Sequence, residues 1–398
     1  MNPIDELLTR GVTQAIDRSH IERRLREGAR LRIKLGIDPT GPLLHLGRAV
    51  PLLKLRAFQD LGHLPVIVIG DFTGRIGDAS DKDAERRMLG RDEVEANMAG
   101  YLGQIGRILD MERVEIAYNS DWLGPMTFEE VAHLANLFSV AEMLDRENFF
   151  KRYKEGKRIS LREFLYPLMQ GYDSVAVRAD VELGGNDQLF NLLAGRSIQR
   201  AHAQEPQDIM TFGMLEGSDG RKMSTTYGNI IAIADPPDEQ FGKVMRLKDE
   251  LILAYFELTT RAPRQRIEDL RQSLRGGLNP MEAKLLLAEE IVGLYHCPED
   301  ARAARERFLQ VFRQRELPDE IPEVILPEGP ITLQALLAEA GLAPSRSEAG
   351  RLIRGGGVRL NGQVVTDVSL GITVGPTPLL LQVGRRRVAR IVSRPARR

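Results

Sequence analysis

The stretch from Arg30 to Arg48 reads RLRIKLGIDPTGPLLHLGR and predicts a strand, a turn and the start of a helix. One set of alternating positions is apolar and consists of Leu31, Ile33, Leu35 and Ile37. The other set includes Lys34, Gly36 and Asp38, and such alternation is typical of a strand with one face on the core. We therefore expect this second set to line whatever lies above the sheet.

A second strand is expected soon after the first. A helix with an apolar face is predicted from about Leu46, and residues 64–70 then read LPVIVIG. This continuous apolar run, closed by glycine, is the pattern of a strand buried on both faces. Strand, helix and strand in this order predict a parallel α/β sheet with a site at the carboxyl ends of its strands.

The rest of the chain divides by composition and periodicity. Helical patterns cover residues 84–107 and 239–315, and residues 127–153 are expected to form amphipathic helices inserted between the halves of the sheet. Residues 317–330 carry four prolines and several acidic side chains, so we interpret them as a linker. At 398 residues the chain is long enough for roughly two to four domains.

Charge separates the C-terminal part of the chain from the remainder. The net charge is −1, yet residues 331–398 contain 11 arginines, no lysines and 3 acidic residues, a balance of +8. The remainder therefore carries −9, and this asymmetry indicates a polyanion partner at the C-terminal end. A charged tail that only improves solubility is the alternative interpretation.

Cysteine and hydropathy limit the class of protein further. Cys297 is the single cysteine, which excludes a disulfide within the chain and cysteine-rich zinc sites. No apolar stretch approaches about 18 residues, and the first residues lack a signal-peptide pattern. We therefore expect no membrane span and a cytoplasmic location.

Two pairs of motifs carry a family resemblance. Asp38-Pro39-Thr40 with HLGR at 45–48, followed much later by GRKMS at 220–224, resembles the two signatures of class I aminoacyl-tRNA synthetases. YPLMQGYD at 166–173 and GGNDQ at 184–188 narrow the resemblance to the bacterial tyrosyl-tRNA synthetases. The resemblance implies activation of tyrosine with ATP to tyrosyl-adenylate and pyrophosphate, and then transfer of tyrosine to its tRNA.

The resemblance also implies a domain order. A Rossmann-like catalytic domain with a parallel sheet is expected over residues 1–235, with a helical dimerisation insertion at about 120–165. An α-helical anticodon-recognition domain is expected over 236–316, a linker over 317–330, and a small α+β RNA-binding domain over 331–398. A homodimer is the assembly that this family pattern implies.

Reaction at the α-phosphate of ATP needs donors around the leaving pyrophosphate, where charge builds in the transition state. Thr40 and His45 lie on a turn that leads into a helix, where backbone N–H groups favour anions. The resemblance gives as catalytic residues Thr40, His45, Lys82, Arg86, Lys222 and Thr225. It gives as ATP-binding residues Gly36, Asp38, His45, Gly47, Arg48, Gly185, Asp187, Lys222, Met223 and Ser224.

Two of these positions depart from the family pattern. Arg48 stands where a second histidine is usual, and it can still reach a ribose oxygen or a phosphate. Thr225 stands where the family usually has a second loop lysine. A monovalent cation such as K⁺, Arg221, or the Lys82/Arg86 pair are the candidates for the missing charge. An exposed helix face is the alternative interpretation of Lys82 and Arg86.

The amino-acid pocket must distinguish tyrosine from phenylalanine by one hydroxyl, which a buried polar partner does well. The resemblance gives as tyrosine-binding residues Lys34, Asp78, Tyr166, Gln170, Asp173 and Gln188, with Asp173 on the hydroxyl. Tyr166, Gln170 and Asp173 are spaced to share one helix face, which favours a lined cavity over core packing. Asp78 has a second interpretation as a helix N-cap.

Lys34 is a third departure, because many members of the family have tyrosine there. We expect it either to pair with Asp173 or to donate to the phenol oxygen of the substrate. No general base is required, since the substrate carboxylate is already ionised and positioning supplies most of the rate. Magnesium is expected to arrive with ATP, and no metal site within the protein is predicted.

Residues 342–362 resemble the alpha-L RNA-binding domain, which is shared by a small-subunit ribosomal protein and bacterial tyrosyl-tRNA synthetases. Ser345 or Ser347 can cap a helix whose exposed face carries Arg346, Arg351 and Arg354, and a glycine turn with a β-ribbon follows. Such a face suits the phosphates of structured RNA.

Two other functions remain open from the sequence. A tryptophanyl-tRNA synthetase would share the sheet and the signatures, and an aspartate on the same helix can bind an indole N–H. An inactive homologue that only binds RNA is the second alternative, and the departures at Arg48 and Thr225 are its only support.

Overall fold

The structure is a computed structural model that describes residues 2–78, 87–315, 321–384 and 387–393. The chain divides into two compact units, residues 1–305 and 306–398, and each is described by itself. None of the described helices is long and apolar enough to span a bilayer.

A six-stranded sheet forms the centre of the first unit, in the order β1-β6-β5-β2-β3-β4. All neighbouring strands run parallel except β1, which pairs antiparallel with β6 at one edge. The strands are β1 (Val12–Ile16), β2 (Arg32–Ile37), β3 (Leu64–Ile69), β4 (Glu115–Tyr118), β5 (Val181–Gly185) and β6 (Asp208–Phe212). The predicted Rossmann-like parallel sheet is confirmed, and both apolar runs that predicted strands form β2 and β3.

The strand order reverses between β2 and β5. From β2 the chain proceeds to β3 and β4 on one side, whereas from β5 it proceeds to β6 on the other. Because crossovers between parallel strands are right-handed, α3 (Leu46–Asp60) and α12 (Leu189–Ala201) cover opposite faces of the sheet. Ligands of such sheets bind in the crevice at the carboxyl ends of the strands, where the order reverses.

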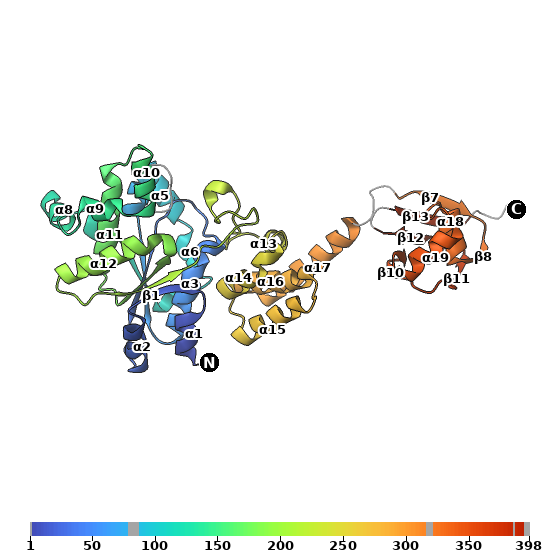
Figure 1. The fold of residues 1–398 in the computed structure, drawn as a ribbon, viewed down its shortest axis with the longest axis horizontal. Coiled ribbons are helices and arrows are strands. Elements are labelled where there is room, and N and C mark those ends of the chain that lie inside the picture. The colour runs from blue at the N-terminus through green and yellow to red at the C-terminus, as the bar shows by residue number, and fades with distance from the viewer. Residues whose placement is uncertain (1, 79–86, 316–320, 385–386, 394–398) are drawn as a thin grey trace. The chain divides into compact units, whose positions relative to one another are not determined.

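The helix α11 (Leu161–Ala176) brings several polar side chains to this crevice. It begins at a capping box in which Ser160 and Glu163 satisfy each other's backbone N–H groups. It packs closely on α12 (Figure 1). A Cβ atom added to Gly171 would lie only 3.0 Å from the backbone nitrogen of Gly195. This close packing fixes the height of Tyr166, Gln170 and Asp173 above the sheet.

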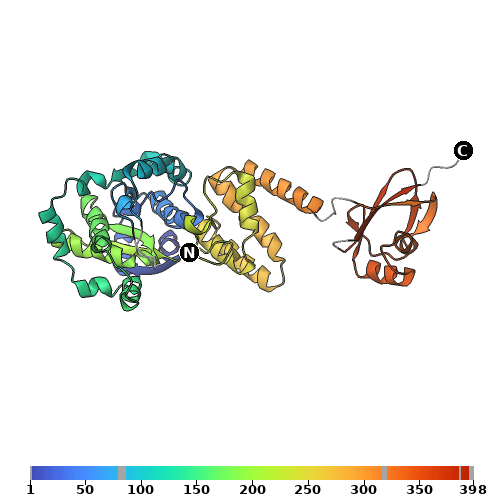
Figure 2. The same ribbon diagram turned by 90° about the horizontal axis from the view of Figure 1, so that it is seen from above.

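Other helices of the first unit surround the sheet (Figures 1 and 2). Near the N-terminus and before β4 lie α1 (Pro3–Thr9), α2 (Arg18–Arg26), α4 (Thr73–Ile76), α5 (Arg91–Met98) and α6 (Tyr101–Ile105). Between β4 and β5 lie α7 (Ser120–Leu123), α8 (Phe128–Ala135), α9 (Val140–Leu144), α10 (Glu147–Lys154) and then α11. The amphipathic helices predicted for residues 127–153 are therefore confirmed.

A group of helices follows the sheet, as the periodicity of residues 239–315 predicts. Its members are α13 (Pro237–Met245), α14 (Ile252–Thr259), α15 (Arg264–Arg275), α16 (Pro280–Tyr295) and α17 (Pro298–Arg315). The pairs α13–α16, α14–α16 and α14–α15 are in contact, and α14 also contacts α3. The side chain of Arg10 crosses to this group and donates to the carbonyls of Phe256 (3.1 Å) and Thr260 (2.8 Å).

The second unit has a hydrophobic core of its own, centred on Leu336, Ile353, Val358 and Leu381. Its helices are α18 (Leu333–Glu339) and α19 (Arg346–Arg354). Its strands are β7 (Glu323–Leu326), β8 (Gly329–Thr332), β9 (Val358–Leu360), β10 (Gln363–Val364), β11 (Gly371–Val374), β12 (Leu379–Val383) and β13 (Arg387–Ser393). The order of the larger sheet is β10-β9-β12-β13-β7, and β8 pairs with β11.

The linker predicted for residues 317–330 is wrong at 323–326 and 329–330, where strands form, and residues 317–320 lie outside the described part of the chain. Residues 323–326 form β7, which pairs parallel with β13, and residues 329–332 form β8, which pairs antiparallel with β11. Both strands lie at sheet edges, where proline is tolerated because one side of the backbone needs no partner. Pro322 and Pro327 flank β7, so the prolines mark the limits of a strand instead of its absence.

Candidate active site

A cavity of about 460 Å³ lies at the carboxyl ends of β2 and β5. Its lining comes from the end of β2, the turn before α3, the helix α11, the segment after β5, and the loop that follows β6. The predicted residues that line it are Gly36, Asp38, Thr40, His45, Gly47, Arg48, Asp78, Tyr166, Gln170, Asp173, Gly185, Asp187, Gln188, Lys222, Met223, Ser224 and Thr225.

Asp38 is held at the end of β2 by two hydroxyl groups. Thr73 donates to Oδ1 at 2.7 Å, and Tyr166 donates from α11 to Oδ2 at 2.8 Å. Burial raises the pKa of the Asp38 carboxyl, while these two hydrogen bonds act in the opposite direction. A Cβ atom on Gly70 would lie 2.0 Å from Oδ1, so the carboxylate fits because residue 70 is glycine.

The turn between β2 and α3 brings Thr40, His45 and Arg48 together. Arg48 donates through Nη1 to the carbonyl of Asp38 (2.8 Å) and through Nη2 to Oγ1 of Thr40 (2.9 Å). His45 is the N-cap residue of α3. Burial lowers the pKa of its imidazole to about 3, with Arg48 and Lys222 adding to the effect, so the ring is neutral at physiological pH.

Glycine at position 47 leaves room for this imidazole, since an added Cβ atom would lie 3.1 Å from the ring. Nδ1 of His45 is buried and has no hydrogen-bond partner within the described part of the chain. A turn with a neutral imidazole, a hydroxyl, a guanidinium and the N-terminus of a fifteen-residue helix is suited to anionic oxygen atoms.

The loop after β6 also lines the cavity. Lys222 forms an ion pair with Asp187 (Nζ–Oδ2, 3.1 Å), and the neighbouring Met223 is buried. Asn229 shapes this loop, because its side chain accepts from the N–H of Ser224 (2.9 Å) and donates to Asp219 (2.7 Å). No motif in the sequence pointed to Asn229.

Arg221, a candidate for the missing loop cation, is engaged elsewhere. Its guanidinium pairs with Asp219 at 2.7 Å and lies 4.5 Å from the ring centre of Tyr227. Thr225 faces the turn that precedes α3, since its Cγ2 atom is 4.0 Å from the position of a Cβ on Gly41. The loop therefore approaches the turn that carries Thr40, with an uncharged residue at position 225.

Asp173 lines the cavity and is buried. Trp122 donates from its indole to Oδ1 at 2.8 Å, and Asn119 donates to Oδ2 at 3.4 Å. Burial raises the pKa of the Asp173 carboxyl to about 7, although Lys34 and both hydrogen bonds favour the ionised form. Trp122 and Asn119 were missed by sequence reasoning because they belong to the segment after β4, which carries no motif.

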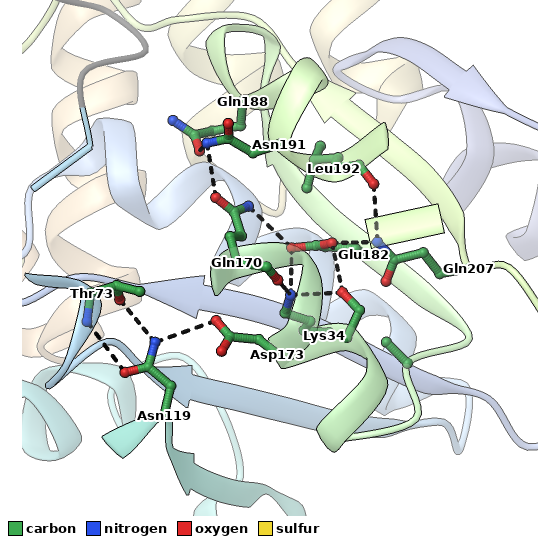
Figure 3. Close-up of polar contacts among 12 residues, drawn as sticks. Lys34, Thr73, Asn119, Gln170, Asp173, Glu182, Gln188, Asn191, Leu192 and Gln207 are labelled. Atoms are coloured by element: carbon green, nitrogen blue, oxygen red, sulfur yellow. Dashed lines mark hydrogen bonds and ion pairs between the residues drawn. The ribbon is translucent and has the colours of Figure 1, made fainter. Parts of the chain in front are cut away.

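Lys34 lies below the cavity and does not pair with Asp173, contrary to one of the two expectations. Its ammonium group contacts Oε1 of Glu182 (2.9 Å), the carbonyl of Gln170 (2.9 Å) and Oγ of Ser174 (2.8 Å), as Figure 3 shows. Three donors therefore meet three acceptors, and the side chain is completely buried. Strand order decides this, because β5 lies beside β2 and brings Glu182 next to Lys34.

Amide side chains connect the remaining predicted residues (Figure 3). Asn191 on α12 donates to Oε1 of Gln170 (3.0 Å) and to Oε1 of Gln188 (3.1 Å). Gln188 in turn donates to Oδ2 of Asp78 at 2.6 Å. Asn191 was not predicted, yet it orients two of the predicted side chains.

Five of the predicted residues remain to be located. Lys82 and Arg86 lie outside the described residues. Arg346, Arg351 and Arg354 belong to α19 of the second unit, where the side chain of Ser345 caps the helix by accepting from the N–H of Glu348. The arginines of α19 are exposed, and Arg351 pairs with Glu348 at 2.7 Å.

The family of the chain follows from comparison with known proteins. Residues 26–313 match the family of tRNA synthetases class I (W and Y), and residues 331–375 match the S4 domain. The chain therefore belongs to the class I tRNA synthetases of the tryptophan and tyrosine type.

Curated relatives identify the branch of this family. A tyrosine–tRNA ligase of Moorella thermoacetica is 49% identical over 391 residues, which cover 97% of this chain and 94% of the relative. A tyrosine–tRNA ligase of Thermotoga maritima is 48% identical over 389 residues, which cover 97% and 96%. By this similarity the chain is a member of the tyrosine–tRNA ligase family.

Solved structures agree with the fold. A C-terminally truncated mitochondrial tyrosyl-tRNA synthetase of Aspergillus nidulans superimposes with a TM-score of 0.65 at 23% identity, over 78% of this chain and 94% of that one. A tyrosyl-tRNA synthetase of Archaeoglobus fulgidus, solved with L-tyrosine, gives a TM-score of 0.60 at 20% identity, over 76% and 98%.

Proposed function

We propose that this cavity joins L-tyrosine to ATP, forming tyrosyl-adenylate and pyrophosphate, and that the tyrosyl group then passes to the 3′ end of tRNA(Tyr). The buried Asp173 carries this proposal. A substrate without the para hydroxyl would leave this buried carboxylate one donor short, so the pocket disfavours phenylalanine.

The remaining tyrosine contacts follow from chemistry and position. The α-ammonium of the substrate requires acceptors, which Asp78, Tyr166 and Gln170 provide around one part of the cavity. Gln188 orients the substrate carboxylate from the segment after β5. Lys34 supports this pocket from below through Gln170 and Ser174.

ATP, supplied as its magnesium complex, is placed along the turn before α3. Gly36, Asp38, Gly185 and Asp187 surround the ribose, and a Cβ atom on Gly36 would meet nothing within 4 Å, which leaves space for close approach. Thr40, His45 and Arg48 face the β- and γ-phosphates from one side. Lys222, Met223 and Ser224 face them from the loop after β6, and we propose that Lys82 and Arg86 contribute further positive charge to the same phosphates.

We propose that K⁺ supplies the positive charge that is missing at Thr225. Arg221 is engaged by Asp219 and Tyr227, so it is a poorer candidate. Rates of adenylate formation measured in potassium and in sodium buffers test this choice. Equal rates in the two buffers would exclude K⁺ and return the role to Lys82 and Arg86.

We propose a separate function for each domain. Residues 1–235 activate tyrosine, residues 236–316 approach the anticodon, and residues 331–398 hold structured RNA through the arginines of α19. Because ATP and tRNA are cytoplasmic, the protein works in the cytoplasm. A homodimer is supported by exposed apolar side chains on α8 to α11, namely Phe128 (89% exposed), Val140 (66%), Phe150 (50%), Tyr153 (62%) and Leu161 (80%).

Exchange of pyrophosphate into ATP tests the function directly. Tyrosine should support exchange, whereas phenylalanine and tryptophan should not. Exchange with tryptophan would reassign the pocket to the tryptophanyl enzyme. If no amino acid supports exchange in folded protein with magnesium and potassium present, the chain is an RNA-binding homologue without this activity.

A further inference from the structure

We propose that Glu182, paired with Lys34, is a positioning residue that fixes the side-chain amide of Gln170 with its oxygen toward the substrate's α-ammonium group. This inference rests on the proposed function, because it assumes that Gln170 contacts the ammonium group. Neither the signature motifs nor the predicted site residues include Glu182.

The pair lies under the cavity and is withdrawn from solvent. Lys34 is 0% exposed and Glu182 is 1% exposed, and their ion pair measures 2.9 Å. Each residue compensates the buried charge of the other, so neither charge is isolated. A carboxylate in such an ion pair only accepts hydrogen bonds.

Among the described residues, the hydrogen-bond and ion-pair partners of the Glu182 carboxylate are all donors. Gln170 donates through Nε2 to Oε1 at 3.2 Å, and Ser174 donates to Oε2 at 3.2 Å. Gln207 also donates through its amide nitrogen to Oε2. The carboxylate therefore selects the NH₂ end of the Gln170 amide, as Figure 3 shows.

The opposite end of the same amide is selected independently. Asn191 donates to Oε1 of Gln170 at 3.0 Å, so the oxygen points away from Glu182. A reversed amide would place its oxygen against the carboxylate and its NH₂ group against the NH₂ group of Asn191. Both contacts would be repulsive, so the network allows one orientation only.

The selected orientation suits the substrate. Gln170 lines the cavity, and an ammonium group carries donors only, so it gains from the amide oxygen and is repelled by the NH₂ group. Lys34 adds a second restraint, because it also donates to the backbone carbonyl of Gln170 at 2.9 Å. The pair thus holds both the main chain and the amide of the residue that meets the substrate.

The test compares tyrosine with 3-(4-hydroxyphenyl)propionate, which retains the phenol and the carboxylate but lacks the amino group. Lys34 also influences Asp173, but both molecules carry the phenol, so this effect cancels in the ratio of their affinities. In the double variant K34M/E182L the ratio should fall about tenfold or more, since one charge-assisted hydrogen bond is lost. KM for ATP should stay within about twofold.

Asp208→Asn is the matched control. Asp208 is another buried carboxylate of the sheet, and its ion pairs run to His20 (2.9 Å) and Arg196 (4.0 Å). This variant should lower the thermal midpoint without changing the affinity ratio. If the double variant does not fold, K34M/E182Q carries the same test, because its neutral amide can present either end to Gln170.

An unchanged ratio in a folded variant would overturn the inference and reduce the pair to a structural role. Equal weakening of both molecules would also overturn it. Failure of the proposed function has a different signature, since the unmodified protein would then show no tyrosine-dependent exchange at all.

Discussion

Arg48 donates to the hydroxyl oxygen of Thr40 across 2.9 Å, and the same guanidinium holds the carbonyl of Asp38 at 2.8 Å. The residue that departs from the family pattern therefore braces the turn between β2 and α3. In the proposed reaction it would also keep a positive charge close to the leaving pyrophosphate.

Replacement of Arg48 by alanine should slow adenylate formation roughly 10- to 100-fold, because two charge-assisted hydrogen bonds are lost. Thr40→Ala should have a smaller effect in the Arg48→Ala background than in the unmodified protein, because the two residues act together. Single-turnover formation of tyrosyl-adenylate measures both effects. Strictly additive losses would show that the contact does not matter for the reaction.

The pKa of Asp173, which burial raises to about 7, predicts a pH dependence for tyrosine. The ionised carboxylate accepts from the phenol, so kcat/KM for tyrosine should fall as the pH drops below about 7, and it should level off above that value. KM for ATP should not show this pH dependence, because the imidazole of His45, with a pKa of about 3, stays neutral throughout this range. A flat tyrosine profile between about pH 6 and about pH 8 would contradict the assignment.

The same shift predicts how folding stability changes with pH. The folded-state pKa of Asp173 lies above the unfolded value, so the folded protein binds the proton more tightly. This group's contribution to stability is full below about pH 4 and is lost as the pH rises through about 7. Thermal midpoints of the unmodified protein and of Asp173→Ser should differ least at low pH.

Lys222→Ala should lower the rate of adenylate formation by about 100-fold or more, because a cation that faces the leaving phosphates is lost. KM for tyrosine should change little, since Lys222 pairs with Asp187 and is not a predicted tyrosine contact. Lys248→Ala, an exposed lysine after α13, is the control. A rise in KM for tyrosine without a change in rate would place Lys222 outside the phosphate site.

The exposed apolar side chains of α8 and α11 predict a dimer. Phe128→Asp with Leu161→Asp should yield monomers in sedimentation velocity experiments, because these are among the most exposed apolar residues. Glu129→Gln, an exposed neighbour on α8, should leave the assembly intact. Sedimentation of the unmodified protein as a monomer would remove the basis for this prediction.

The arginines of α19 are expected to contact RNA phosphates. In R351A/R354A, KM for tRNA should rise and the salt dependence should weaken by about one unit of slope per lost phosphate contact. Pyrophosphate exchange, which needs no tRNA, should be unaffected. Arg26→Ala, an exposed arginine of the first unit, is the control for nonspecific charge effects.

Local patterns in the sequence predicted much of this fold. The alternation before Asp38 and the apolar run at 64–70 correspond to β2 and β3, and the spacing of Tyr166, Gln170 and Asp173 corresponds to one face of α11. These features depend on neighbours within one element, where periodicity is informative. The linker prediction failed because proline marks strand edges as well as loops.

Partners that lie on different strands could not be predicted in the same way. The partner of Lys34 is Glu182 because β5 lies beside β2, and only the strand order decides that. Trp122, Asn119 and Asn191 contact predicted residues from segments without motifs. Such partner residues can be identified only from the three-dimensional structure.

The pairing of Ile33 with Val181 has a consequence for biosynthesis. The first half of the cavity leaves the ribosome early, whereas the strand that completes it emerges only after β4 and the helices α7 to α11. Until then Lys34 lacks its ion-pair partner Glu182, and the backbone edge of β2 that later pairs with β5 is unpaired. A nascent chain therefore has no tyrosine pocket until β5 has been made, near the middle of the chain. We expect chaperones to bind the chain mainly during this first part of its synthesis.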